Sequence, residues 1–247
     1  MFPIRDHNPS GRTPYVTYAL MAANVLIFAG YFLTIPTEEG LAYFFYDWGL
    51  VPRFVSEGQG YAGLITHMFL HGGWMHLLGN MLFLYIFGDN LEDVMGHVGF
   101  ALFYLMSGLA AAGLQFVADP VSEIPMVGAS GAIAGVMGGY LLLFPRARVD
   151  VLLIIVILIR VFPVPAWVML GLWFAFQVFS GFAMPTEQGG VAYWAHAGGF
   201  AAGVILTLPA FLRRGGAGFW TRTHGHPDHP PAEYKLNRST IPRVPRR

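Results

Sequence analysis

The sequence predicts an all-α polytopic membrane protein with six transmembrane helices and both termini in the cytoplasm. The 247 residues are 55% hydrophobic and only 11% charged, and the mean hydropathy is +0.53. A soluble domain carries about 25% charged residues. Six windows contain no Asp, Glu, Lys or Arg, and each is long enough for a bilayer-crossing helix of about 20 residues. The loops between them differ in basic content, and this difference predicts the orientation.

The six windows follow one another along most of the chain. They cover residues 13–37, 58–88, 94–118, 124–145, 161–186 and 188–212. Residues 151–159 are also apolar, but they are too few for a crossing helix and are followed by Arg160 and Pro163. We interpret them as an extended or interfacial lead-in to the fifth helix, with a seventh crossing as the alternative.

Basic residues lie mainly in the segments that an even number of crossings places together. These segments hold Arg5, Arg12, Arg146, Arg148, Arg213, Arg214, Arg222, Lys235, Arg238, Arg243, Arg246 and Arg247. The loops on the other side hold Arg53 and half of the acidic residues. Because short cytoplasmic loops are enriched in Lys and Arg, both termini are predicted to be cytoplasmic.

Three segments follow from this reading. Residues 1–12 form a cytoplasmic N-terminal segment, residues 13–212 form the membrane domain, and residues 213–247 form a basic tail. The tail is rich in Pro, Arg and His and has no apolar period, so we expect it to be disordered. His224, His226 and His229 leave metal binding in the tail as an alternative.

The composition also limits the chemistry. No cysteine is present, which excludes a thiolate nucleophile, a disulfide framework and a Cys-ligated metal. A net charge of zero argues against a nucleic-acid-binding protein. No metal or other cofactor is predicted, and the oligomeric state stays open. Catalysis, if present, falls to Ser, His, Asn and the carboxylates.

Polar residues inside apolar spans are costly and therefore mark candidate sites. They are His67, His71, His76 and Asn80 in the second window, Ser130 in the fourth and His196 in the sixth. The second, fourth and sixth helices all run from outside to inside. These residues lie near the start of each helix, so they occupy similar depths and can converge.

Small residues at four-residue spacing allow the fourth and sixth helices to pack closely. Gly131 and Gly135 follow Ser130, and Gly199 and Gly203 follow His196. Ser130 and His196 can therefore come within hydrogen-bond reach, which a Ser/His nucleophile requires. None of the spans contains a carboxylate, so a dyad is favoured over a triad. Ordinary membrane packing is the alternative explanation of the glycines.

An oxyanion formed by serine attack needs preorganised donors. His76 and Asn80 are four residues apart and share a helix face. The backbone N–H of a residue at a helix start, such as Ser130, lacks an intrahelical partner. Gly128 allows a substrate backbone to approach closely.

Together these residues resemble the rhomboid family of intramembrane serine proteases. Gly128, Ser130 and Gly131 look like the family's GxSG motif, and His196 with Gly199 looks like its AHxxG motif. His76 and Asn80 match the family's His and Asn in the second helix. The resemblance covers roughly residues 15–212. It implies a six-helix rhomboid bundle in which Ser130 and His196 form the catalytic dyad and His76 and Asn80 stabilise the oxyanion.

The resemblance further implies single-span membrane proteins as substrates, cleaved in or near their transmembrane segment. Trp173, Phe174 and Gln177 on the fifth helix are candidates for a lateral substrate gate, with lipid-facing aromatic residues as the alternative. A bacterial inner membrane is the expected location. A catalytically silent protein that binds membrane clients is one alternative function. A His-based metal-dependent membrane protein, with His67 and His71 among its ligands, is the other.

Two features depart from the family pattern. The Trp-Arg pair that the family places in the first external loop is absent, and residues 61–63 read Tyr, Ala and Gly. Some members place a tyrosine one turn after the nucleophile, where it stacks on the catalytic histidine, whereas this chain has Ala134. Neither departure removes a reacting group. They concern the loop contacts and the way His196 is held.

Overall fold

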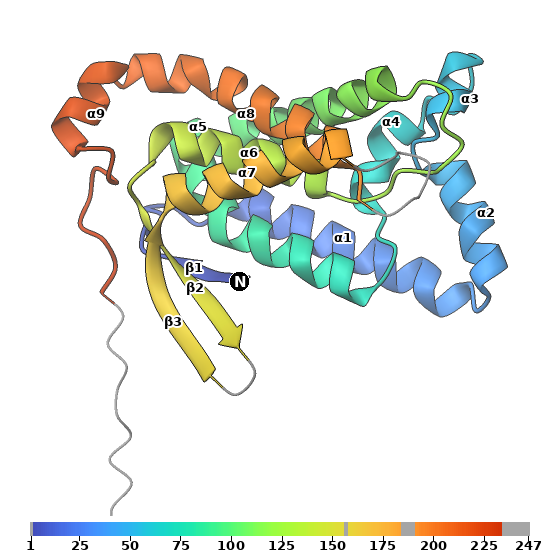
Figure 1. Cartoon of the computed structure of the whole chain (residues 1–247), viewed down its shortest axis with the longest axis horizontal. Helices are drawn as coiled ribbons and strands as arrows, with labels where there is room; N and C mark the ends of the chain where they lie inside the picture. Colours follow the sequence, from blue (N-terminus) through green and yellow to red (C-terminus); the bar gives the residue numbers. More distant parts are fainter. Residues whose placement is uncertain (1, 156–157, 184–190, 234–247) are drawn as a thin grey trace, which may run out of the picture.

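A computed structural model describes residues 2–155, 158–183 and 191–233. Its helices are α1 (Tyr15–Thr34), α2 (Glu38–Trp48), α3 (Pro52–Ser56), α4 (Gly63–Thr66), η1 (His67–Phe69), α5 (Trp74–Ala118), α6 (Ser130–Leu143), α7 (Ala166–Ala183), α8 (Tyr193–Arg213) and α9 (Ala217–Thr223). Its strands are β1 (Phe2–Asp6), β2 (Arg148–Ile155) and β3 (Leu158–Pro165). The sheet and α9 lie at one end of the bundle, and α2, α3 and α4 lie at the other (Figure 1).

Among the described helices, α1, α5, α7 and α8 are long and apolar enough to cross a membrane. The predicted second and third helices are joined in the 45-residue α5, and the predicted fourth helix is the shorter, 14-residue α6. Inside α5 the backbone leaves helical geometry at Gly96, where φ is 73° and ψ is 165°. A side chain is disfavoured at this positive φ, so glycine permits the break. The result is two helical arms that meet at Gly96.

The second helix starts later than its charge-free window. Helix α5 begins at Trp74, after an extended Gly73. His67 lies in η1 and His71 in the loop that follows, so neither stands on the long helix with His76 and Asn80. The consecutive glycines Gly72 and Gly73 explain the difference, because glycine disfavours the helix interior.

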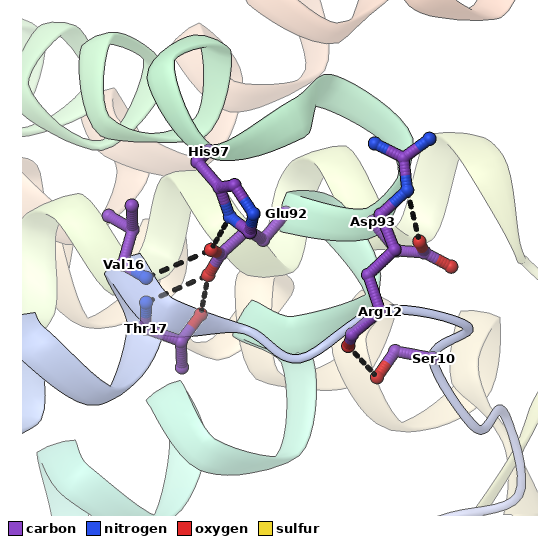
Figure 2. Close-up of polar contacts among 7 residues, drawn as sticks. All are labelled: Ser10, Arg12, Val16, Thr17, Glu92, Asp93 and His97. Atoms are coloured by element: carbon purple, nitrogen blue, oxygen red, sulfur yellow. Dashed lines mark hydrogen bonds and ion pairs between the residues drawn. The ribbon is translucent and has the colours of Figure 1, made fainter.

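A buried carboxylate organises the region near the Gly96 break (Figure 2). Glu92 accepts hydrogen bonds from the backbone N–H groups of Val16 and Thr17, at 2.9 and 2.8 Å, and from the Thr17 hydroxyl. His97 Nδ1 lies 2.5 Å from the same carboxylate. Glu92 thus caps the first turn of α1, where backbone N–H groups lack intrahelical partners. Glu92 falls between the second and third apolar windows of the sequence, and the structure places it inside α5.

The expectation of an all-α protein is corrected by a three-stranded antiparallel sheet in the order β1-β2-β3. Residues 151–155 of the predicted extended segment lie in β2 and residues 158–159 lie in β3, whereas residues 156–157 fall outside the described residues. Val149 and Val151 are buried, as suits β-branched residues on a packed sheet face. The N-terminal residues pair with β2 through Arg5 and Asp150, which form an ion pair at 2.7 Å.

The expectation of disorder from residue 213 is also corrected over residues 213–233. Helix α8 continues to Arg213, and α9 follows a turn at Gly215 and Gly216. Phe219 of α9 is buried, and the Trp220 indole N–H donates to the carbonyl of Leu142 at 2.9 Å. A seven-residue helix is too short to reveal an apolar period in sequence. Residues 234–247 of the predicted tail lie outside the described residues.

Candidate active site

Glycine residues of α8 pack directly against the backbone of α6. A Cβ added to Gly199 would lie 1.9 Å from the carbonyl oxygen of Gly131, and one added to Gly203 would lie 1.9 Å from that of Gly135. No side chain fits at such a separation. The two helices therefore approach as closely as backbones can, which brings the first turns of both helices together.

Ser130 and His196 meet at this junction. Ser130 is the first residue of α6, and His196 is the fourth residue of α8. The Ser130 hydroxyl lies 2.7 Å from His196 Nε2, within the range of a good hydrogen bond. Both side chains are half-buried. The geometry meets the first requirement for a serine nucleophile, which is a base in contact with its proton.

The other ring nitrogen of His196 contacts Gln177 of α7. Nδ1 lies 2.8 Å from the Gln177 amide oxygen, and Gln177 is buried with 5% of its surface exposed. Because an amide oxygen only accepts hydrogen bonds, Nδ1 carries the ring proton. The lone pair of Nε2 is then free to accept from Ser130. From the sequence alone Gln177 is only a gate candidate, because spacing does not reveal which side chain of α7 faces α8.

An aromatic ring also contacts His196. The Trp173 ring centroid lies 5.6 Å from that of His196 with an interplanar angle of 35°. Ala134 is fully buried and offers no ring. The structure therefore places Trp173 of α7 against His196. The sequence alone does not show which residue holds this ring in the absence of a tyrosine at position 134. Phe174 lies apart from His196 and stacks on Phe200 of α8 at 4.5 Å.

His76 lies on the other side of Ser130, across Gly128. His76 Nδ1 accepts a hydrogen bond from the Gly72 backbone N–H at 3.3 Å, so Nε2 carries the proton and is a donor. A Cβ on Gly128 would lie 2.8 Å from His76 Nε2 and 3.4 Å from the Ser130 oxygen. The absent side chain leaves that space open, and the φ of 134° at Gly128 also disfavours any other residue.

Asn80 provides a second donor close to His76 in α5. It is 7% exposed, and its amide nitrogen has no hydrogen-bond partner among the described residues. Buried amide groups are almost always paired, so this donor is available to a group that enters the site. The backbone N–H of Gly128 is not free for this purpose, because it donates to the carbonyl of His67 at 2.9 Å.

His67 and His71 lie in a segment that is held by hydrogen bonds to nearby backbone and to α1. His67 Nδ1 lies 2.7 Å from the carbonyl oxygen of Gly63, which begins the adjoining helix α4. The backbone of His71 is held by Tyr31 of α1, whose hydroxyl donates to the His71 carbonyl at 2.6 Å. Within residues 2–155, 158–183 and 191–233, no group of three His, Cys, Asp or Glu side chains has metal-binding geometry.

The segment from α2 to α4, where the Trp-Arg pair is absent, makes its own set of contacts. Arg53 of α3 forms ion pairs with Glu57 at 2.9 Å and with Glu123. These two carboxylates raise the pKa of Arg53 above its ordinary value. The backbones of Leu50 and Met126 form an isolated antiparallel bridge. Loop contacts therefore come from a different set of residues in this chain.

Comparisons with known proteins agree with these motifs. The family model described as the Rhomboid domain matches residues 58–213. RHOMBOID-like protein 4 of Arabidopsis thaliana is 31% identical over 83% of this chain and 45% of its own length. Rhomboid protein 1, mitochondrial, of Saccharomyces cerevisiae is 29% identical over 77% of this chain and 51% of its own. The Bacillus subtilis protein named "Putative rhomboid protease YdcA" is 40% identical over 35% of this chain and 43% of its own.

The chain spans about half of the length of these relatives or less. They include plant, mitochondrial and bacterial proteins, so the family occurs in several membranes. The matched region contains α5, α6, α7 and α8, with Ser130, His196 and Gln177. By the extent of this match, the chain belongs to the rhomboid family of multi-pass integral membrane proteins.

Proposed function

We propose that this protein is an intramembrane serine endopeptidase that uses Ser130 as nucleophile and His196 as general base. The observation that carries the proposal is the 2.7 Å contact between the Ser130 hydroxyl and His196 Nε2. The substrates are single-span membrane proteins, cleaved in or near their transmembrane segment. The bacterial inner membrane stays a prediction from the sequence.

The mechanism proceeds by proton transfer and covalent catalysis. His196 Nε2 takes the Ser130 proton as the oxygen attacks a peptide carbonyl. The charge on the carbonyl oxygen is stabilised by His76 Nε2–H, the Asn80 amide and the Ser130 backbone N–H. The imidazolium then gives its proton to the leaving amine, which separates as the acyl-serine forms. Water, deprotonated by His196, releases the acyl group and restores the Ser130 hydroxyl.

Six crossings are supported by the sheet. Strands β1 and β2 pair, so Asp6 and Arg148 lie on the same side of the membrane and an even number of crossings separates them. Helices α1, α5 and α6 would give three crossings if α5 crossed once. The break at Gly96 makes α5 cross twice, which gives four. The bond from the Ala232 N–H to the His7 carbonyl requires two more, α7 and α8, and returns both ends to one side.

This arrangement places Ser130 inside the membrane rather than at its surface. Helix α6 has 14 residues and is therefore about 21 Å long, against about 30 Å for the hydrocarbon core. With the end of α6 at the cytoplasmic surface, Ser130 lies below the external surface, where a helical substrate must unwind to present a carbonyl. Entry past α7 is the proposed route, because Trp173 stands beside His196 on that helix.

The test uses purified protein in liposomes with a generic single-span substrate and a fluorophosphonate probe. We expect Ser130→Ala and His196→Ala to abolish cleavage and Ser130→Ala to abolish labelling, with no effect of EDTA. Ser107→Ala is the matched control, because it removes another buried hydroxyl that has no partner among the described residues. Wild-type cleavage in Ser130→Ala would disprove the assignment of the nucleophile.

The same experiment separates the alternatives. A client-binding protein would bind the substrate without cleaving it and would not react with the probe. A metal-dependent enzyme would lose activity in EDTA and retain it in Ser130→Ala.

A further inference from the structure

A cavity of about 800 Å³ lies at the end of the bundle opposite the candidate active site. Its walls come from the ends of α6 and α7, the middle of α8 and the short α9. Figure 1 shows α9 folded back beside this end of the bundle after the turn that follows α8. The contacts of Phe219 and Trp220 described above hold α9 in place. The cavity is therefore a feature of the tertiary fold.

The wall that α6 and α8 contribute to the cavity is apolar. Leu141 of α6 and Val204 of α8 line it, and Val204 stands nine residues before the end of α8 at Arg213. At 1.5 Å per residue, this places Val204 about 14 Å below the helix end. The cavity thus extends from the aqueous end of the bundle into the depth of one leaflet. An apolar chain of several carbons fits along this wall.

The mouth of the cavity is polar and basic. Arg146 lines it, and its Nη1 donates to the carbonyl of His224 at 3.0 Å. The Arg146 backbone N–H donates to the carbonyl of Gly225 at 2.8 Å. These bonds hold both the backbone and the guanidinium of Arg146, and the guanidinium has further N–H donors beyond the one used. Trp167 and Trp220 flank it, and tryptophan is typical of the membrane interface.

The charges around the mouth favour an anion. Among the described residues, the lining holds Arg146 and no Asp or Glu, and Arg222 directly follows the lining residue Thr221. Asp228 is the acid nearest in sequence to α9, and it pairs with Arg214 at 3.0 Å. A basic mouth on an apolar cavity matches a phospholipid, in which a phosphate joins acyl chains. A soluble anion would use the mouth alone.

We propose that this cavity binds one anionic phospholipid, with its phosphate at Arg146 and an acyl chain along Leu141 and Val204. The proposal requires the membrane location of the bundle but not the Ser130 and His196 chemistry. Its failure would leave the proposed protease function untouched. Arginine suits the role because its planar guanidinium binds phosphate in a bidentate manner.

The test is native mass spectrometry of the full chain in detergent, titrated with phosphatidylglycerol or phosphatidylcholine. We expect phosphatidylglycerol to bind at one site, and Arg146→Gln to weaken this binding about fivefold to tenfold. Arg148→Gln is the matched control, because it removes an exposed arginine two residues away. Equal binding of both lipids, unchanged in Arg146→Gln, would overturn the proposal.

A second variant guards against an indirect effect of Arg146 on the His224 turn. Val204→Phe fills the apolar part of the cavity and leaves the mouth unchanged. We expect it to weaken phosphatidylglycerol binding while thermal unfolding stays close to that of the wild type. Inorganic phosphate and glycerol phosphate distinguish a free anion from a lipid. Displacement of the lipid by either at millimolar concentration, with no effect of Val204→Phe, would indicate an anion site and refute the lipid site.

Discussion

Gln177 orients His196 through one hydrogen bond, which its amide oxygen accepts from Nδ1 of the ring. Its carbonyl fixes the proton on His196 Nδ1 and so directs the basic lone pair of Nε2 at Ser130. Gln177 is therefore a third, neutral member of the proposed Ser130/His196 dyad. The amide holds the ring without adding a charge to an apolar site, where a carboxylate would be costly to bury.

Replacing Gln177 tests this positioning role. Gln177→Leu keeps the size of the side chain and removes the acceptor, so kcat should fall roughly tenfold or more while KM changes little. Gln177→Glu restores an oxygen acceptor and should recover part of kcat. Steady-state cleavage kinetics in liposomes give both constants. Equal losses in the two variants would mean that Gln177 acts through packing alone.

Asn80 is expected to lower the stability of the protein while it supports catalysis. Its amide nitrogen is buried without a partner among the described residues, and such a group costs free energy in the resting enzyme. Asn80→Ala should therefore lower kcat by about 10²-fold or less without lowering the unfolding temperature. Cleavage rates and thermal unfolding in detergent measure the two effects. An unchanged rate would remove Asn80 from the oxyanion site.

Among the elements, the α6 and α8 pair sets the geometry of the site. Gly203 has no room for a methyl group beside the Gly135 carbonyl. Gly203→Ala should therefore push the helices apart, lower stability by about 1–3 kcal/mol and reduce cleavage. Gly113→Ala on α5 is the control, because a Cβ there would meet nothing within 4 Å. Thermal unfolding and cleavage of both variants check the prediction, and equal behaviour would contradict it.

Helix α7 contrasts with this pair. Gly171 of α7 has open space around it, and Phe176, Phe179 and Phe182 are more than half exposed. Trp173 and Gln177 are the side chains of α7 that reach His196. A helix with this loose packing can shift more readily than α6 or α8. A shift of α7 that admits substrate would therefore also release both supports of the histidine.

At the scale of the whole molecule, the N-terminal segment responds to pH. Burial raises the pKa of Asp6 to about 8, nearby Asp89 adds to the increase, and the Tyr140 hydroxyl, which donates to Asp6 at 2.8 Å, opposes it. A carboxyl with a raised pKa stabilises the fold fully below its unfolded pKa of about 4. That contribution is lost as pH rises through about 8.

We therefore expect β1 to be protected most strongly at acidic pH and to loosen between about pH 4 and pH 8. Hydrogen exchange of the β1 amides measures the protection, with α8 as an internal reference. Asp6→Asn keeps the acceptor for Tyr140 without the titration, so its exchange should vary less with pH. Asp150 opposes the trend only at acidic pH. Burial raises its pKa, but His7 and Arg5 lower it below its ordinary value.

Much of this molecule could be predicted from its sequence. The apolar windows matched α1, α5, α7 and α8 because bilayer-crossing helices need long apolar runs. The contact of Ser130 with His196 follows from glycine stripes that directly succeed both residues. Gln177 could not be assigned, because its role depends on the rotation of α7. Strand β1 was missed because its five residues gain stability only from a partner about 145 positions away.

That distant pairing also orders the steps by which the protein is made. Phe2–Asp6 leaves the ribosome before its partner strand Arg148–Ile155, which follows about 145 residues later. At roughly 5–20 residues per second, the N-terminal segment waits about 7 to 30 s without its partner. The helices from α1 to α6 must insert during this interval. The sheet can close once Pro165 is made, but the hydrogen bond from the Ala232 N–H to the His7 carbonyl forms only after α7 and α8 have followed. Assembly at this end therefore finishes only after synthesis of the membrane domain.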